Sequence, residues 1–225
     1  MFESLTVTYF KYSLIKESES KELFILQSSI LSLETITEVE KTLTLALLLM
    51  QNPIRDYETA IAMLNDVSLT EVNLQVLIIG AEIDSVWPII QPNPFIDRLK
   101  AIYPKCLNHE KSIIAYLEAI NIDNLLDVQH EKILRVPQLL KESVELCDDY
   151  VYNYYRLALL SDRTTAKLLM EKALSNVTLI ETDGEETNVL IDPYLSFERY
   201  LSEHITGTRI GVEQFSFLKN YYSSL

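Results

Sequence analysis

The histidines are the first side chains of this sequence to consider for catalysis or metal binding. His109, His130 and His204 lie at unrelated points, and none belongs to a ligand spacing such as His-Glu-x-x-His. A histidine that acts in catalysis or binds zinc also needs a partner that orients its ring, and we identify none in the sequence. We therefore expect no catalytic or metal-binding histidine.

Acidic residues form three clusters, and a metal ion or a pair of catalytic carboxylates would need such groups. The clusters are Glu17, Glu19 and Glu22; Asp148 and Asp149; and Asp183, Glu185 and Glu186. A calcium loop needs alternating oxygen ligands closed by a bidentate glutamate, and the stretch after Asp183 offers too few. We interpret all three as solvated charge and predict no metal, no cofactor and no enzymatic activity. The alternative is an enzyme with a metal-assisted acidic site in a helical bundle, which would depend on Asp148 and Asp149.

Tyrosines give the strongest indication of a binding surface. A tyrosine combines a large apolar contact area with a polar hydroxyl, and tyrosines are enriched among the residues that dominate binding energy. Four of them fall in one predicted helix, directly after an aspartate pair, although tyrosines at this spacing also commonly lie at the edge of a helical core. The candidate partner-binding residues are Asp148, Asp149, Tyr150, Tyr152, Tyr154 and Tyr155.

The overall charge limits the kind of partner. The 225 residues include 33 Asp and Glu against 19 Lys and Arg, a formal net charge of -14 at pH 7. Such a chain repels nucleic acids and anionic membrane surfaces, so we expect neither as a ligand. With four glycines in all, the sequence contains neither of the Gly-rich phosphate-binding motifs of nucleotide-binding folds. The same charge attracts a basic protein or peptide, which we predict as the partner.

The first residues and the cysteines indicate the compartment. Residues 1–5 lack the basic and apolar stretches of a signal peptide, and the apolar stretch from Leu45 to Met50 is far shorter than the roughly 20 residues that cross a bilayer. Cys106 and Cys147 have neither the spacing of a metal site nor the number of a disulfide framework, so we interpret both as core thiols. We therefore expect a soluble, cytoplasmic protein.

Apolar residues recur at helical spacing through most of the first 175 positions, which predicts a mainly α fold. Thr37 and Glu40 form a capping box before a helix, and Asp56 begins the next helix. Prolines between residues 87 and 104 interrupt the pattern, which then resumes. We expect a single helical domain over 1–225, with sub-lobes 1–86 and 95–225 joined by a Pro-rich linker as the alternative. The leucines that we expect to be buried are Leu47, Leu64, Leu117, Leu157 and Leu168.

The periodicity changes after Asn176. Two β-branched stretches, 177–180 and 188–191, flank Asp183-Gly184, and Asp-Gly between two such stretches is a strong short-range signal for a β-hairpin. We predict an antiparallel β-hairpin near residues 177–191. Beyond it we expect a helix opened by Asp192 and Pro193, a break around Gly207, and a last helix from about Val212 to Tyr222.

Three segments align when each is written from a capping residue, and they predict second helices of helical hairpins. They begin at Asp56, His109 and Asp162, with successive starts 53 residues apart. The middle segment, Asn108 to Asp123, resembles the second helix of a tetratricopeptide repeat. This resemblance implies stacked hairpins with a concave peptide-binding surface. The small helix-contact positions of that family fall on Ala60, Ser112, Ala119, Ala166 and Ala173.

The sequence also departs from that family. The small residue expected in the first helix of each repeat falls on Leu48, Lys100 and Tyr154, none of which is small, and the spacing exceeds the family's repeat of about 34 residues. We therefore predict stacked antiparallel helical hairpins that are either tetratricopeptide-like or an irregular helical bundle. The function that we expect is non-enzymatic binding of a basic protein or peptide, as an adaptor or as a toxin-neutralising protein that resembles small acidic immunity proteins. A homodimeric structural subunit is a further alternative to the metal-assisted enzyme.

Overall fold

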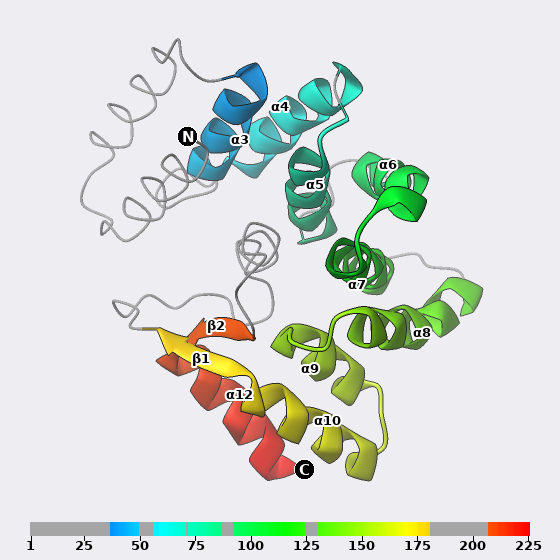
Figure 1. The fold of residues 1–225 in the computed structure, drawn as a ribbon, viewed down its shortest axis with the longest axis vertical. Coiled ribbons are helices and arrows are strands. Elements are labelled where there is room, and N and C mark those ends of the chain that lie inside the picture. Colours follow the sequence, from blue (N-terminus) through cyan, green and yellow to red (C-terminus); the bar gives the residue numbers. More distant parts are fainter. Residues whose placement is uncertain (1–36, 50–55, 71, 87–91, 125–129, 181–206) are drawn as a thin grey trace. The chain divides into compact units, whose positions relative to one another are not determined.

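The computed structural model describes residues 37–49, 56–70, 72–86, 92–124, 130–180 and 207–225 (Figure 1). These residues are mainly helical and include one two-stranded sheet, which confirms the mainly α fold class. The chain divides into two compact units, residues 1–95 (unit 1) and 96–225 (unit 2). The single domain over 1–225 and the sub-lobes 1–86 and 95–225 stay predictions, and residues 87–91 of the Pro-rich linker lie outside the described residues.

Unit 1 contains α3 (Glu38–Leu49), α4 (Tyr57–Thr70) and α5 (Leu74–Val86), with α4 packed against both of the others. The predicted capping box forms, because Glu40 N donates to Thr37 Oγ1 at 3.2 Å and Thr37 N donates to Glu40 Oε2 at 2.7 Å. Asp56 Oδ1 accepts from Thr59 N at 3.1 Å, so α4 begins at the predicted cap. These bonds satisfy main-chain donors that the first turn of a helix leaves without a partner.

Close packing within unit 1 centres on α5. Its residues from Val76 to Ile79 are all at most 1% exposed, so apolar side chains are covered on every side of the helix. At Gly80, a Cβ would lie 2.5 Å from the ring of Phe95. Asn93 positions that ring, because its Oδ1 accepts from Phe95 N at 3.1 Å while its Nδ2 donates to a carbonyl of α5 at 3.4 Å. Gly80 is therefore required by the close approach of an aromatic side chain.

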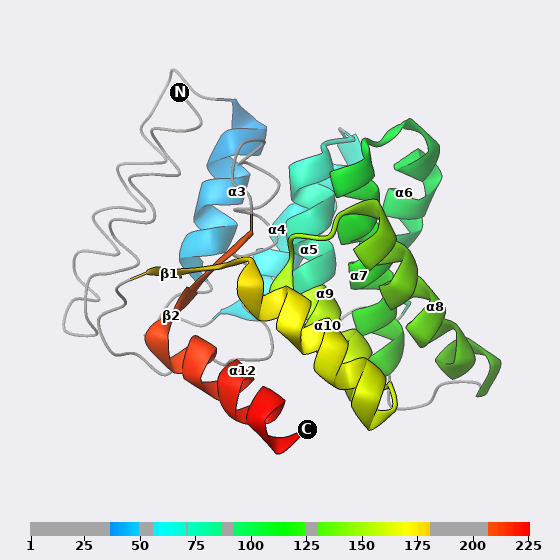
Figure 2. The same ribbon diagram turned by 60° about the horizontal axis from the view of Figure 1, so that its bottom comes forward.

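In unit 2, α7 packs against α8, α8 against α9, and α9 against α10. α12 lies beside α10 (Figure 1, Figure 2). Its elements are α6 (Pro94–Ile102), whose first two residues belong to unit 1, the 3-10 turn η1 (Tyr103–Lys105), α7 (Asn108–Asn124), α8 (His130–Leu146), α9 (Val151–Leu159), α10 (Arg163–Ser175), β1 (Val177–Ile180), β2 (Thr208–Gly211) and α12 (Val212–Ser224). Two of the predicted elements, the strand at 177–180 and the last helix from Val212, are confirmed.

A buried polar network joins α7, α8 and α9. Ser112 Oγ donates to Ser143 O at 2.7 Å, and Ser143 Oγ donates to Ser112 O at 2.6 Å. From α9, Asn153 Nδ2 donates to Ser143 Oγ at 2.6 Å, and all three side chains are fully buried. Because small serines let the helices approach closely, each hydroxyl reaches the main chain of the neighbouring helix. This network links three helices through buried hydrogen bonds, in addition to their apolar contacts.

The described sheet differs from the predicted hairpin. β1 pairs with β2 in parallel, with Val177 opposite Thr208 and Ile180 opposite Gly211. The predicted antiparallel partner, 188–191, and the turn at Asp183 lie outside the described residues. The β-branched stretch identified β1 correctly, but strand propensity carries no information about which distant segment pairs with it.

Gly207 accounts for the strand that the sequence analysis missed. We expected a break around this residue, and the structure has β2 beginning directly after it. Gly207 has a φ of 85°, and a Cβ there would lie 1.9 Å from Asn176 O. Thr208 N donates to that same carbonyl at 3.0 Å, so the glycine turn brings β2 onto β1.

The three aligned segments do not all occupy the same place in a hairpin. α4 and α10 are second helices, packed on α3 and α9 as predicted. α7, which contains the middle segment, pairs most extensively with α8, the helix that follows it, and is therefore the first helix of its hairpin. His109 is correspondingly the second residue of α7 and not its cap. The predicted register of the 53-residue spacing is wrong at this segment, because similar amphipathic patterns suit either helix of a hairpin.

Burial tests the residue-level predictions. All five of the predicted helix-contact positions are buried, namely Ala60, Ser112, Ala119, Ala166 and Ala173. Leu64 and Leu117 are buried as predicted, while Leu157 is half-buried and the side chain of Leu47 lies outside the described residues. The prediction for Leu168 is wrong, since this side chain is 62% exposed. Buried small residues are expected in any closely packed helical hairpin, so the resemblance to tetratricopeptide repeats stays a prediction.

Candidate functional site

The predicted tyrosine cluster lies at the start of α9 and is buried. Tyr150, Tyr152, Tyr154 and Tyr155 are between 2% and 5% exposed. The Tyr150 ring packs edge-on against Tyr116 and Tyr152, with centroids 5.6 Å apart in each pair. These side chains contribute to the core of unit 2, and this position corrects the expectation that they present contact area to a partner.

The aromatic residues of α12 also pack within unit 2. The Tyr155 ring lies edge-on to Phe217 and Tyr221, with centroid distances of 5.8 Å and 5.3 Å. Burial raises the pKa of the Tyr155 hydroxyl above its ordinary value. Phe217 keeps 38% of its surface exposed. Two of the aromatic side chains of α12, Phe217 and Tyr221, are therefore explained by their contact with Tyr155 of α9.

The two predicted aspartates precede α9 and have different surroundings. Asp148 is exposed and accepts a hydrogen bond from Lys172 Nζ at 2.9 Å, which lowers the pKa of its carboxyl. Asp149 is half-buried, and its Oδ1 accepts from Cys147 Sγ at 3.1 Å. The main-chain carbonyl of Asp149 accepts a hydrogen bond from Thr208 Oγ1 at 3.1 Å, which connects the segment between α8 and α9 to β2. Asp148 is thus accessible to a partner, whereas Asp149 stabilises the local fold.

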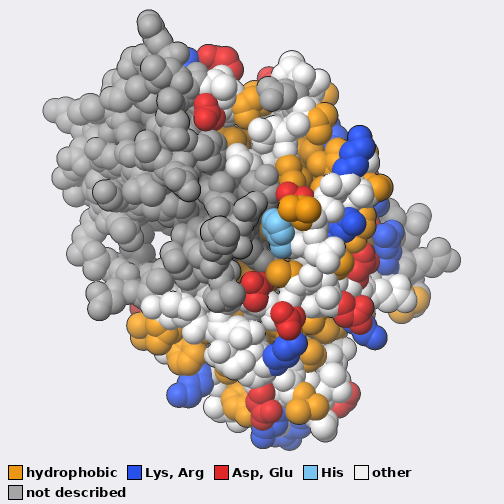
Figure 3. All heavy atoms as spheres, in the orientation of Figure 1, with side chains coloured by type: hydrophobic (Ala, Val, Ile, Leu, Met, Phe, Trp, Pro, Cys, Tyr) orange, Lys and Arg blue, Asp and Glu red, His pale blue; other side chains and the backbone are white. Residues whose placement is uncertain are grey.

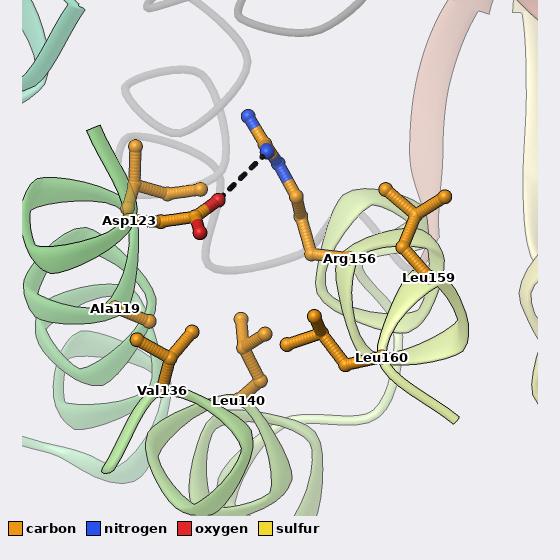
Figure 4. Close-up of a pocket in the computed structure, with 8 residues that line it drawn as sticks. Ala119, Asp123, Val136, Leu140, Arg156, Leu159 and Leu160 are labelled. Atoms are coloured by element: carbon orange, nitrogen blue, oxygen red, sulfur yellow. Dashed lines mark hydrogen bonds and ion pairs between the residues drawn. The ribbon is translucent and has the colours of Figure 1, made fainter. Parts of the chain in front are cut away.

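A small groove lies between α7, α8 and α9, with an ion pair at its edge. Figure 4 shows Asp123 of α7 and Arg156 of α9 pointing toward one another, with Oδ2 and Nη1 3.3 Å apart. Val136, Leu140 and Leu160 line the apolar part. The volume is about 30 Å³, which accommodates a water molecule or a methyl-sized group. Since sites for small molecules usually measure about 300–1,000 Å³, this groove is too small for a metabolite.

The acidic residues are distributed unevenly along the chain. Residues 1–95 contain thirteen acidic residues (Asp and Glu) and five basic ones (Lys and Arg). Residues 181–206 contain seven acidic residues and one basic residue. The remainder of unit 2 is balanced, with thirteen of each. Figure 3 shows this balance on its visible face, where acidic and basic side chains are interspersed over the described part of unit 2. The negative charge is therefore concentrated in unit 1 and in residues 181–206.

The described residues of unit 1 carry seven acidic side chains, of which Glu82 and Asp84 are buried, and a single basic one, Lys41. Lys41 Nζ forms an ion pair with Glu38 Oε1 at 2.9 Å. On α4, the exposed side chains include Glu58 and Asp66, together with Leu69. This surface was not predicted from the sequence, because the net charge of the whole chain does not show where along the chain the charge lies. A count of charge along the chain would have found it.

Metal binding and membrane insertion can be assessed for the described residues. Within those ranges, no group of three or more His, Cys, Asp or Glu side chains is arranged to hold a metal ion. The clusters at 17–22 and 183–186 lie outside them. The helices in the described part of the chain include none that combines the length and apolarity needed to cross a membrane. The absence of enzymatic activity stays a prediction.

No protein-family model, curated protein or solved structure matches this chain.

Proposed function

We propose that the protein is a non-enzymatic binding module for a basic protein or peptide, and that unit 1 attracts this partner. The observation that carries the proposal is the uneven distribution of charge. Residues 1–95 contain thirteen acidic and five basic residues, whereas unit 2 outside residues 181–206 contains equal numbers of acidic and basic residues. A surface of one sign attracts an oppositely charged partner and increases the rate of encounter.

We propose the acidic surface of unit 1 as the binding surface, in place of the tyrosine cluster of α9. Because those tyrosines are buried, they support a role in the core, while Asp148 stays accessible beside Lys172. An adaptor for a basic protein and a neutraliser of a basic toxin are two forms that this function takes. We propose the cytoplasm as its location, which the two free thiols, Cys106 and Cys147, support.

The proposal is tested by capture followed by reconstitution. The intact protein is immobilised, exposed to lysate of the source organism at low salt, and eluted with increasing salt, and each retained protein is identified by mass spectrometry. The retained protein is then purified and its affinity is measured at several ionic strengths. We expect a basic partner whose affinity falls steeply as salt rises, because screening weakens attraction between separated charges.

Other outcomes would contradict the proposal. A neutral or acidic partner, or affinity that does not change with salt, would remove its physical basis. Light scattering that gives twice the mass of the chain would indicate the homodimeric subunit instead. A metal ion that copurifies with the protein, together with an activity that Asp148→Asn and Asp149→Asn abolish, would indicate the metal-assisted enzyme.

A further inference from the structure

The exposed face of α4 combines acidic and apolar side chains. Its exposed residues Glu58, Ala62, Asp66 and Leu69 follow a spacing of four, four and three, which places them on one side of the helix. Ala60, Ile61, Leu64 and Ser68 form the opposite, buried side. The exposed face is about 16 Å long from residue 58 to residue 69, given the rise of an α-helix.

Two apolar side chains at the end of this face are unusually exposed. Leu69 is 67% exposed and Val72, in the turn after α4, is 70% exposed. Among the large apolar side chains of the described residues, these two have the greatest exposed fractions. A single exposed leucine is ordinary on a protein surface, but two highly exposed apolar residues three positions apart in the sequence, close to acidic residues of the same segment, favour an interaction surface.

The acidic side chains of this face have no cation beside them in the described residues. Glu58 and Asp66 form no ion pair within those ranges, and Lys41, the single described cation of unit 1, pairs with Glu38. A cation supplied by another molecule would therefore meet carboxylates that form no ion pair with any residue of the described ranges. The apolar and acidic groups together define the chemistry of the occupant.

We propose that this face of α4, with Val72, docks an amphipathic basic helix of the partner protein. Apolar side chains of that helix contact Leu69 and Val72, while Lys or Arg side chains beside them reach Glu58 and Asp66. A helix laid along an apolar face in this way is a common mode of peptide recognition. This inference rests on the proposed function and specifies its surface and its partner.

The test uses the full chain and two synthetic peptides as probes. One peptide of about 18 residues places leucines on one helical face and lysines around it, and the other has the same composition in scrambled order. Binding is followed by fluorescence anisotropy at low and high salt. The apolar variant is Leu69→Ser with Val72→Ser, matched by Leu168→Ser at a site on α10 that is 62% exposed. The charge variant is Glu58→Gln with Asp66→Asn, matched by Glu145→Gln with Glu213→Gln on unit 2.

We expect the wild-type chain to bind the amphipathic peptide and not the scrambled one. The apolar variant should weaken binding about tenfold, because it removes two aliphatic contacts from the interface. The charge variant should weaken binding about fivefold at low salt and leave it unchanged at high salt. The two matched controls should bind as the wild type does, and circular dichroism should give the same helical signal for all five proteins.

Four other results would each contradict a different part of this proposal. If the wild type binds the amphipathic peptide but the α4 variants behave like their controls, the basic partner docks elsewhere and the proposed function stands. If the scrambled peptide binds equally well, recognition by a helix face is wrong. If neither peptide binds at low salt, the proposed function fails together with this inference. If light scattering shows a dimer that the apolar variant dissociates, the occupant is a second copy of the chain and not a basic helix.

Discussion

Gly207 controls the path of the chain into β2, and a single methyl group at this residue should disturb it. In Gly207→Ala, a Cβ with ideal geometry would lie 1.9 Å from Asn176 O, which is too close for two non-bonded atoms. The φ of 85° also disfavours any residue that has a Cβ. We expect the free energy of unfolding in urea to fall by about 2–4 kcal/mol. The control is Asn220→Ala at an exposed position of α12, which should leave it nearly unchanged. Equal stability of the two variants would contradict this account.

Asp148 should make stability depend weakly on pH. Its pKa is lowered in the folded protein by the hydrogen bond from Lys172, so the ion pair stabilises the fold above the ordinary aspartate pKa of about 3.9. That contribution is lost as the pH falls through the lowered folded value. Since both side chains are exposed, Asp148→Asn should cost about 0.5 kcal/mol at neutral pH. In urea unfolding, the difference in stability between the wild type and Asp148→Asn should be smaller at pH 3 than at pH 7, and an equal difference at both pH values would refute the assignment.

Three of the helix caps could be predicted from single residues, whereas burial could be predicted only in part. Thr37, Asp56 and Asp162 were identified correctly because a cap depends on side-chain and main-chain atoms within three residues. Leu168 was placed in the core by its apolar side chain, but α10 buries the face formed by Ala166, Met170 and Ala173. Helical spacing shows which residues share a face and does not show which face meets a neighbour. The buried tyrosines of α9 illustrate the same limit, because a tyrosine suits both a core and a surface.

At the scale of the elements, the hydroxyl network of unit 2 should contribute strongly to the packing of α7, α8 and α9. Ser143→Ala would leave the Asn153 amide, which now donates to Ser143 Oγ at 2.6 Å, buried without its closest acceptor. We expect a loss of about 1–3 kcal/mol in the free energy of unfolding. A double-mutant cycle with Asn153→Ala should give a coupling energy of about 0.5–3 kcal/mol. Additive effects of the two substitutions would show that the network is not a unit.

A buried carboxylate makes a second connection between elements of unit 2. Glu118 of α7 has a side chain that is 10% exposed, and its Oε1 lies 3.1 Å from Lys100 Nζ of α6 and 3.3 Å from Arg135 Nη2 of α8. Glu118→Gln should lower the free energy of unfolding by about 1–3 kcal/mol, because two cations lose their shared carboxylate. Glu145→Gln, which removes an exposed pair with Lys141, is the control and should change little. A loss no larger than that of the control would contradict this role.

The elements themselves could be predicted better than their pairing. Helical periodicity and caps located α3, α4, α10 and α12, and β-branched residues located β1. Pairing depends on residues far apart in the chain, which no local pattern encodes. The parallel contact of β1 with β2 and the pairing of α7 with α8 were therefore missed. Lys100, where the tetratricopeptide resemblance places a small residue, instead forms an ion pair with Glu118.

At the scale of the whole molecule, the concentration of charge in one part of the chain matters more than its net value. A net charge of -14 spread evenly would attract basic molecules to every face. Here unit 1 holds thirteen acidic against five basic residues, while unit 2 outside 181–206 is balanced. Removing the same number of negative charges from unit 1 and from unit 2 should therefore change the attraction of a basic partner by different amounts.

This inequality gives a prediction about the rate of association with a lysine-rich peptide. The variant of unit 1 is Glu38→Gln, Glu58→Gln and Asp66→Asn, and its control in unit 2 is Asp97→Asn, Glu145→Gln and Glu213→Gln. Both variants remove three negative charges, but the first removes them where cations are scarce. In stopped-flow measurements at low salt, the unit 1 variant should associate about tenfold more slowly, and the control should be within about twofold of the wild type. Rates that fall equally in both variants would show that net charge alone steers the encounter, and the assignment of the binding surface to unit 1 would be wrong.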